Sequence, residues 1–187
     1  LMIGVLLDSS DKNLSVGLVK DHVFLGRVSY LAWQRQSELL VDELSKLLKA
    51  NGLSGKDIDY VVCSKGPGSY TGVRIALTVA KTIAFALNVP LYLASSLEVL
   101  QERGKICAVM MNARGKRSYF AVYSGEEVLV KDCIKENEEV SAYLKDHPEC
   151  VPCGDLSYLG IEKQAGDVLE NLNVCDTPSH LCEESLG

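Results

Sequence analysis

The sequence predicts an α/β fold made of two successive units, each with three strands, a helix and a further strand. Three observations support this. Apolar runs of strand length occupy residues 2–8, 14–19 and 22–28, with polar turn clusters between them. The apolar spacing then becomes helical over 37–50. The same order of strands and helices returns from residue 106, and only weak elements are predicted after Gly154. This order is typical of mixed sheets. We expect a first lobe over 2–103 and a reduced second lobe over 104–187.

In the first lobe, leucines recur at helical spacing across 37–50. Ser37 is the expected N-cap, and Asn51-Gly52 is the expected helix end. A β-rich run follows at 60–64, and a second helix is expected from about residue 73 to residue 87. Residues 90–94 are predicted to be extended, and 96–103 to form a further helix. The second lobe should contain strands at 106–111, 118–123 and 127–131, a helix over 136–145 and a strand at Val151.

Composition and charge exclude several classes of protein. The chain has 187 residues, of which 25 are acidic and 19 basic, and its net charge is −6. An acidic surface repels phosphate backbones, so direct nucleic-acid binding is disfavoured. No apolar run reaches the ~20 residues of a membrane span, and no signal peptide is visible. We therefore expect a soluble, cytoplasmic protein.

Seven cysteines and the absence of a secretory signal predict reduced thiols. Cys63 and Cys107 lie in apolar runs and are predicted to be small core residues. Cys150 and Cys153 form a C-x-x-C pair, with Cys175 and Cys182 downstream. The second spacing does not match a zinc site, and Gly154 follows where a redox motif would begin a helix. We expect Cys150 and Cys153 to be free thiols without metal.

The glycine-rich segment over residues 66–72, GPGSYTG, resembles a phosphate-binding loop but fails both standard tests. A P-loop would end in Gly-Lys-Ser/Thr, and here Val73-Arg74 follow Gly72. A dinucleotide fingerprint would place glycine where Thr71 stands. The alternative is a sharp strand-to-helix corner at which backbones approach closely.

The helix expected after this segment is apolar around most of its circumference. Its alanines, four residues apart, form a ridge of small side chains, and its polar residues form one stripe. Such a helix is buried on more than one side, either within its own core or under a partner subunit. The ridge consists of Ala76, Ala80 and Ala84, and the stripe of Arg74, Thr78, Lys81 and Thr82.

Candidate catalytic residues are few. His22, His147 and His180 are scattered, without a metal-binding His-x-x-x-His pair, and no Gly-x-Ser-x-Gly elbow occurs. Asp8-Ser9-Ser10 follows the first strand, where an actin-like ATPase would grip phosphate, although Asp and Ser also favour turns. A stand-alone actin-like ATPase or phosphotransferase using Asp8 and Ser10 therefore remains the alternative to a non-catalytic protein.

Several segments together resemble the TsaB (YeaZ-type) family of bacterial tRNA threonylcarbamoyladenosine (t6A) synthesis. The most distinctive is KGPGSYTGVR over residues 65–74, running into the alanine-rich helix. The others are LDSS at 7–10, QSELL at 36–40, SSLE at 95–98, and NAR at 112–114 with Tyr119. The resemblance covers residues 2–124 well and the remainder loosely.

The resemblance implies an actin/Hsp70-like (ASKHA, ribonuclease H-like) fold with a reduced second lobe. It also implies a non-catalytic subunit that supports TsaD in forming t6A at position 37 of tRNAs reading ANN codons. It further implies association with the ATPase TsaE, a homodimer in isolation, and contact with tRNA only through the complex. No intrinsic cofactor or metal is expected, and ATP or ADP is expected only at the complex interface.

Two sets of site residues follow from this comparison and from the helical pattern. The expected partner interface comprises Ser37, Leu40, Glu43, Leu44, Leu47, Arg74, Ile75, Thr78, Val79, Thr82 and Phe85. The candidate nucleotide cleft comprises Asp8, Ser9, Ser10, Gly66 and Gly68.

Overall fold

The computed structural model describes residues 1–32, 34–162 and 166–186, and it divides the chain into two compact units. The first unit contains residues 1–94 together with 168–187, and the second contains residues 95–167. The expected boundary between residues 103 and 104 was therefore wrong, and so was the assignment of the C-terminal residues to the second lobe. Those residues return to the first unit because helix α5 (Val168–Leu172) packs on its strands β1, β2 and β4.

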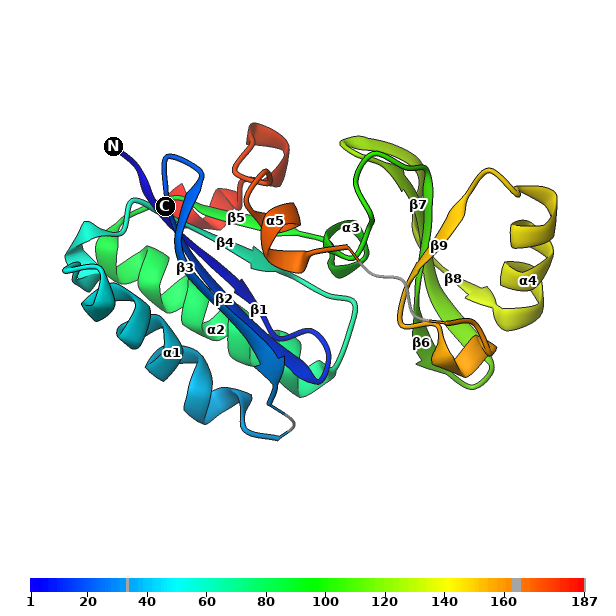
Figure 1. Ribbon diagram of the computed structural model, residues 1–187, viewed down its shortest axis with the longest axis horizontal. Helices are drawn as coiled ribbons and strands as arrows, with labels where there is room; N and C mark the ends of the chain where they lie inside the picture. The colour runs from blue at the N-terminus through cyan, green and yellow to red at the C-terminus, as the bar shows by residue number, and fades with distance from the viewer. Residues whose placement is uncertain (33, 163–165, 187) are drawn as a thin grey trace. The chain divides into compact units, whose positions relative to one another are not determined.

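The first unit contains a five-stranded sheet of order β3-β2-β1-β4-β5 (Figure 1). Strands β1, β2 and β3 are antiparallel, which confirms the predicted meander, whereas β4 and β5 run parallel to β1. Consecutive parallel strands need a crossover, which the two long helices of this unit supply. The strands span Ile3–Asp8 (β1), Asn13–Lys20 (β2), Val23–Leu31 (β3), Tyr60–Ser64 (β4) and Leu91–Ala94 (β5).

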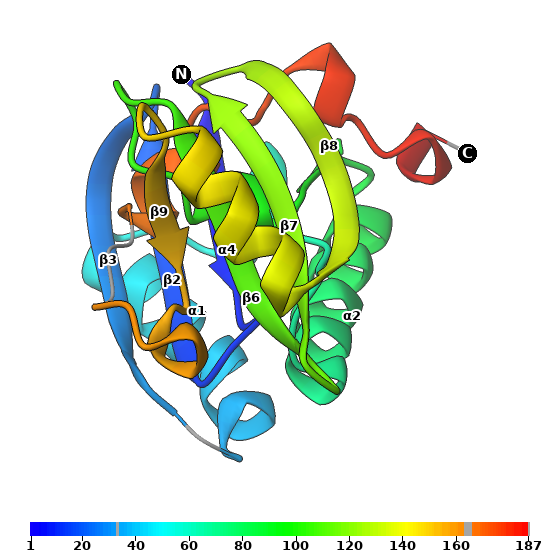
Figure 2. The ribbon, with the colours of Figure 1, turned by 90° about the vertical axis from the view of Figure 1, so that its right-hand side faces the viewer.

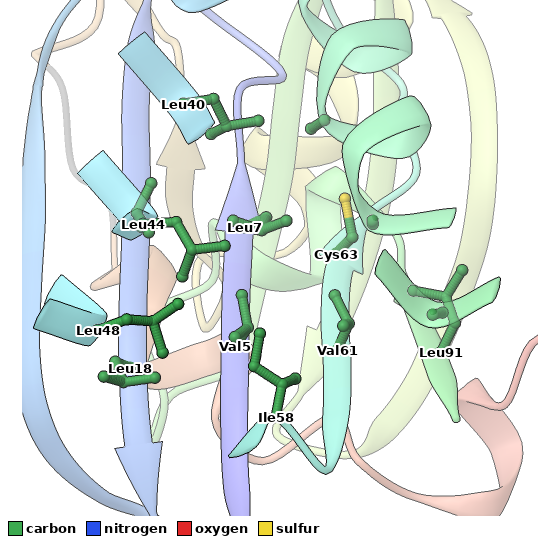
Figure 3. Packing of buried hydrophobic residues seen from close by; sticks show 14 of the residues in the cluster. Val5, Leu7, Leu18, Leu40, Leu44, Leu48, Ile58, Val61, Cys63 and Leu91 are labelled. Carbon is green, nitrogen blue, oxygen red and sulfur yellow. The ribbon is translucent and has the colours of Figure 1, made fainter. Parts of the chain in front are cut away.

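Helices α1 (Gln36–Ala50) and α2 (Tyr70–Leu87) lie side by side on one face of this sheet (Figure 1). Leu40, Leu44 and Leu48 of α1 point toward the strands in Figure 3 and are buried there. The alanine ridge of α2 is buried in the same core, because small side chains allow a helix backbone to approach closely. Helix α5 packs on the opposite face, where its Leu169 and Leu6 of β1 both lie beside Gly17 of β2.

The helix ends differ in detail from the sequence expectation. Helix α1 is preceded by Arg35 at the N-cap position, so Ser37 lies inside the helix and is not its cap. Its C-cap is Asn51, followed by Gly52 in the left-handed region, as predicted. Helix α2 begins at Tyr70 because the Ser69 side chain caps it by accepting a hydrogen bond from the Gly72 amide.

The second unit contains a four-stranded sheet of order β8-β7-β6-β9, and helix α4 crosses one face of it (Figure 2). Strands β6, β7 and β8 are antiparallel and β9 is parallel to β6, so the predicted β-β-β-α-β order is confirmed in this unit. The elements are α3 (Ser96–Val99), β6 (Cys107–Arg114), β7 (Arg117–Ser124), β8 (Glu127–Glu136), α4 (Asn137–Asp146) and β9 (Val151–Gly154). Helix α3 is shorter, and β8 longer, than the sequence predicted.

Short 3-10 turns complete the chain. They span Gly55–Asp57, Ser157–Leu159, Pro178–His180 and Glu183–Leu186. In the first unit, Leu181 pairs with Tyr92 in an isolated antiparallel bridge, and the amide of Cys182 donates to the carbonyl of Leu91. The C-terminal segment therefore continues the sheet beyond β5.

Candidate functional site

An open groove runs along α2 on the first unit. Its volume is about 390 Å³. Five of the eleven residues expected at a partner interface line it, namely Ser37, Arg74, Ile75, Thr78 and Val79. Because they come from both α1 and α2, the groove is a product of the packing of these two helices. A concave surface with apolar and polar lining side chains is suited to receive a side chain or helix from another molecule.

Tyr70 and Thr71 also line this groove, and the sequence analysis did not select them. Tyr70 is 75 % exposed. The Arg74 guanidinium lies 5.2 Å from the centre of the Tyr70 ring and donates from Nη1 to the Tyr70 hydroxyl at 3.1 Å. The sequence does contain a signal for Tyr70, which is its spacing from Arg74. Once the helix begins at Tyr70, these two residues are four positions apart on one face.

Most of the exposed positions of α2 carry polar side chains, and the apolar side chain of Phe85 stands out among them. Phe85 is 88 % exposed, and Thr82 is exposed while its hydroxyl donates to the Thr78 carbonyl at 2.7 Å. Within the part of the chain that the structure describes, α2 is the one helix whose length and composition would allow a membrane span. Core helices of soluble proteins pass the same test. The buried alanines of α2 face the sheet, which leaves its other sides available to a partner.

The predicted contribution of α1 to the interface is partly wrong. Leu40 and Leu44 lie in the core with essentially no exposed surface, because the leucine stripe of α1 faces the sheet (Figure 3). Leu47 is partly buried against Gly26 of β3. Glu43 is half-buried, and its Oε1 accepts a hydrogen bond from the Tyr30 hydroxyl at 3.2 Å. Of the α1 residues in the predicted set, Ser37 is the one that lines the groove.

The glycine segment forms the close-packed corner that was one of its two interpretations. A β-carbon on Gly68 would collide with the carbonyl oxygen of Ser10, and one on Gly72 with that of Ser9. The Ser69 amide donates to the Ser10 carbonyl at 2.7 Å, and the Ser9 hydroxyl donates to the Gly72 carbonyl at 2.6 Å. Glycine is required here because the turn after β1 lies directly against the backbone.

Asp8 lies at the end of β1 with its carboxylate buried. Its Oδ1 accepts hydrogen bonds from the hydroxyls of Ser10 (2.7 Å) and Ser64. Burial raises the pKa of Asp8 above its usual 3.8, and the hydrogen bonds from Ser64 and Ser10 oppose that shift. The carboxylate is thus held by hydroxyl groups at the carboxyl ends of β1 and β4.

The residues of the candidate nucleotide cleft are therefore only partly brought together. Asp8, Ser9, Ser10 and Gly68 are neighbours, whereas Gly66 lies against Val73. A phosphate site needs amide groups free to donate. The Ser69, Gly72 and Val73 amides donate instead within the segment and to the turn after β1. This arrangement favours a structural role for the glycine segment.

Comparison with known proteins finds similar sequences over most of this chain. A family model described as "TsaD: tRNA N6-adenosine threonylcarbamoyltransferase" matches residues 24–149. The chain is 30 % identical over 141 residues to the tRNA threonylcarbamoyladenosine biosynthesis protein TsaB of Bacillus subtilis, which covers 73 % of this chain and 61 % of that protein. TsaB of Buchnera aphidicola subsp. Schizaphis graminum is 27 % identical over 130 residues, covering 66 % of this chain and 61 % of that protein. The chain thus spans about 61 % of the length of these relatives.

Two solved structures have the same fold. YeaZ from Pseudomonas aeruginosa superposes with a TM-score of 0.64 at 25 % identity, covering 72 % of this chain and 67 % of that one. A protein described as uncharacterized, with similarity to peptidase YEAZ from Pseudomonas aeruginosa, gives a TM-score of 0.76 at 21 % identity, covering 93 % and 90 %. Together with the two mixed sheets, these matches confirm the expected actin-like, ribonuclease H-like fold.

The chain belongs to the family described by the TsaD model. Within that family it is a TsaB-type protein, as its similarity to TsaB proteins from several bacteria and to YeaZ shows.

Proposed function

We propose that this chain is a non-catalytic scaffold subunit that binds a TsaD-type partner and supports formation of N6-threonylcarbamoyladenosine at position 37 of tRNAs reading ANN codons. The observation that carries the proposal is the groove on α2 together with the exposed Phe85 side chain farther along the same helix. The names of the bacterial relatives place them in t6A biosynthesis. Because fold alone does not define function, the proposal rests on this surface of α2.

The surface of α2 is suited to a helical partner. Its alanine ridge faces the sheet. Ile75 and Val79 are partly buried against the same core but line the groove, and Phe85 is exposed, so all three can contact another molecule. A second copy, or a related chain with the same two helices, would complete a four-helix layer across a two-fold axis. Burial of ~800 Å² per partner is usual for a specific interface. We propose a homodimer for the isolated chain and a heterodimer with the TsaD-type subunit in the working complex.

The scaffold role also leads to proposals for tRNA, for the TsaE-type ATPase and for nucleotide. The net charge of −6 makes the chain a poor primary binder of tRNA, so tRNA would be held by the complex. We propose that the TsaE-type ATPase joins the same assembly, and that any ATP or ADP belongs to the complex interface. The chain alone should catalyse neither threonylcarbamoyl transfer nor peptide hydrolysis.

The test is a double substitution on α2, Val79→Glu in the groove with Thr82→Arg one turn farther along, on the full chain. Val79 lines the groove and is partly buried, and Thr82 is exposed three residues later on the same helix, so charged side chains there would be desolvated at the interface. We expect the variant to sediment as a monomer and to lose most support for tRNA modification in a mixture reconstituted with the TsaD-type and TsaE-type subunits. The matched control is Ser141→Arg with Ala142→Glu, which adds the same two side chains at exposed positions of α4.

The control should leave both the association and the modification unchanged. A folded groove variant that still dimerises and supports full modification would contradict the placement of the interface. Loss of modification with an intact dimer would show that the TsaD-type subunit uses the groove and that the homodimer uses another surface. Transfer activity in the isolated chain would contradict the scaffold role itself.

A further inference from the structure

Basic side chains gather at the turn between β6 and β7 of the second unit. Residues 104–124 contain four basic residues and no acidic one, although the whole chain has 25 acidic and 19 basic residues. Three of the four, Arg114, Lys116 and Arg117, lie within four positions of one another and are exposed. The turn that carries them lies at the lower end of both strands in Figure 2. We call these three residues the basic turn.

The backbone of the hairpin keeps these side chains at its tip. Arg114 is opposite Arg117 across the two strands, so only Gly115 and Lys116 connect them. Both connecting residues have positive φ, at 63° and 59°, as two-residue hairpin turns require. A β-carbon on Gly115 would lie 3.8 Å from Nε of Arg117, so the Arg117 side chain runs back beside the turn. Its guanidinium group therefore stays at the tip of the hairpin.

The base of the turn is fixed to the rest of the second unit by hydrogen bonds. The amide of Asn137, the first residue of α4, donates to the carbonyl of Lys116 at 2.9 Å. The side-chain oxygen of Asn137 accepts a hydrogen bond from the Ser118 hydroxyl at 2.8 Å, and that hydroxyl accepts one from Tyr158 at 2.6 Å. Ser118 is fully buried. The basic turn thus has a rigid support, which lowers the entropy lost when it binds another molecule.

The charges of the basic turn are not neutralised within the described part of the chain, where its three side chains form no ion pair. The acidic residues nearest to it are Glu136, opposite Arg117 in the strand register, and Glu138 and Glu139 in the first turn of α4. All three glutamates are exposed, and the last two are favoured by the positive end of the helix dipole. These carboxylates would repel a broad acidic surface. A narrow anionic strand can still reach the tip of the hairpin.

We propose that the basic turn contacts phosphate groups of the tRNA backbone when this chain is assembled with its TsaD-type partner. The inference rests on the proposed function, which brings tRNA to the complex. An arginine side chain binds phosphate through two parallel hydrogen bonds, and a lysine side chain binds it as a point charge. The net charge of −6 repels RNA from the rest of the chain, so this contact adds to the binding by the partner and does not replace it. Because phosphates carry no sequence information, the contact would strengthen binding of any tRNA that the complex holds.

The experiment replaces all three basic residues together in the full chain, as Arg114→Gln, Lys116→Gln and Arg117→Gln. Binding of an unmodified tRNA to the complex with the TsaD-type subunit is then measured at several KCl concentrations. Each phosphate contact contributes about 0.7–0.9 to the slope of log affinity against log salt, so the slope should become shallower by about 2–3. In the modification assay with the TsaE-type subunit added, KM for tRNA should rise while kcat stays at the parent value, because the lost contact is a binding contact.

Two control variants separate the position of the charges from their number. The matched control is Lys20→Gln with Lys56→Gln and Lys145→Gln, which removes three positive charges at exposed, scattered positions. It should leave the salt slope unchanged. The second control, Arg114→Lys with Arg117→Lys, keeps the charges of the turn. It should retain most of the salt slope of the parent chain, which a purely structural role of the two arginines would not predict.

The inference is overturned if the complex of the triple glutamine variant assembles and binds tRNA with the salt slope of the parent, or if the scattered control lowers the slope as much. Loss of association with the TsaD-type subunit would also overturn it, because the basic turn would then bind a protein. If the parent chain itself does not bind that subunit, the proposed function fails, and the turn is tested on the chain alone. Crosslinks to tRNA at low salt should then map to residues 107–124, and crosslinks only elsewhere would overturn the inference.

Discussion

The hydroxyl group of Ser9 donates a hydrogen bond of 2.6 Å to the carbonyl oxygen of Gly72, and both residues are buried. This bond joins the turn after the first strand to the first turn of α2, across 63 residues of sequence. The carbonyl of Ser9 lies so close to Gly72 that a β-carbon there would collide with it. The glycine segment therefore sets the position of the helix that carries the proposed interface.

Replacing Gly72 with alanine should destabilise the first unit. The added methyl group meets a backbone carbonyl, which cannot move away as a flexible side chain could, so we expect a loss of about 1–3 kcal/mol in the free energy of unfolding. Urea denaturation followed by circular dichroism measures this. The control is Gly55→Ala, where a β-carbon meets no atom within 4 Å. Equal stability of the two variants would contradict the close packing at Gly72.

Replacing Ser64 with alanine should have a cost that depends on pH. The pKa of Asp8 is raised in the folded state. The contribution of this carboxyl group to the free energy of unfolding is therefore largest below pH 3.8, and it falls as the pH rises through the folded-state pKa. The Ser64 hydroxyl stabilises the ionised carboxylate, so its removal should cost about 1.5–3 kcal/mol at neutral pH and less in acid.

Ser9→Ala is the matched control for this pH dependence. Ser9 donates to an uncharged carbonyl, so its removal should cost the same at both pH values. Unfolding in urea at pH 7 and near pH 4 separates the two variants. A Ser64→Ala cost that does not change with pH would show that Asp8 does not titrate in this range.

Truncation of two neighbouring residues of α1 should have very different effects on stability. Leu40 is fully buried against the sheet, so Leu40→Ala should cost about 2–5 kcal/mol of unfolding free energy. Val41 is 53 % exposed, so Val41→Ala should change stability by less than ~0.5 kcal/mol. If Leu40→Ala instead weakened partner binding with unchanged monomer stability, the original assignment of Leu40 to the interface would be restored.

The purified chain should not turn over ATP. The amides of Ser69, Gly72 and Val73 donate within the protein, and the carboxyl group of Asp8 is held by serine hydroxyls, so these groups are not arranged to hold a phosphate. Phosphate release measured with Mg²⁺ should equal the buffer background. Metal-dependent release that disappears in Ser10→Ala would instead support the alternative of an actin-like ATPase or phosphotransferase.

The sequence by itself determined the order and type of most elements. The strands of the meander, the two long helices and the repeated order in the second unit follow local periodicity, which depends on neighbours a few residues apart. The glycine segment could also be assigned from the sequence, because both phosphate-loop patterns fail at Thr71 and Val73. The resemblance to the TsaB family depended on the same segment.

Only the tertiary structure decided which faces are covered and which distant residues meet. The leucine stripe of α1 could have faced a partner or the sheet, and packing placed Leu40 and Leu44 on the sheet. Cys153 has its sequence neighbour at Cys150, yet the parallel pairing of β6 and β9 places it beside Val109 of the neighbouring strand. The C-terminal segment rejoins the first unit through α5. These outcomes depend on strand pairing and burial between residues far apart in the chain, which local spacing does not encode.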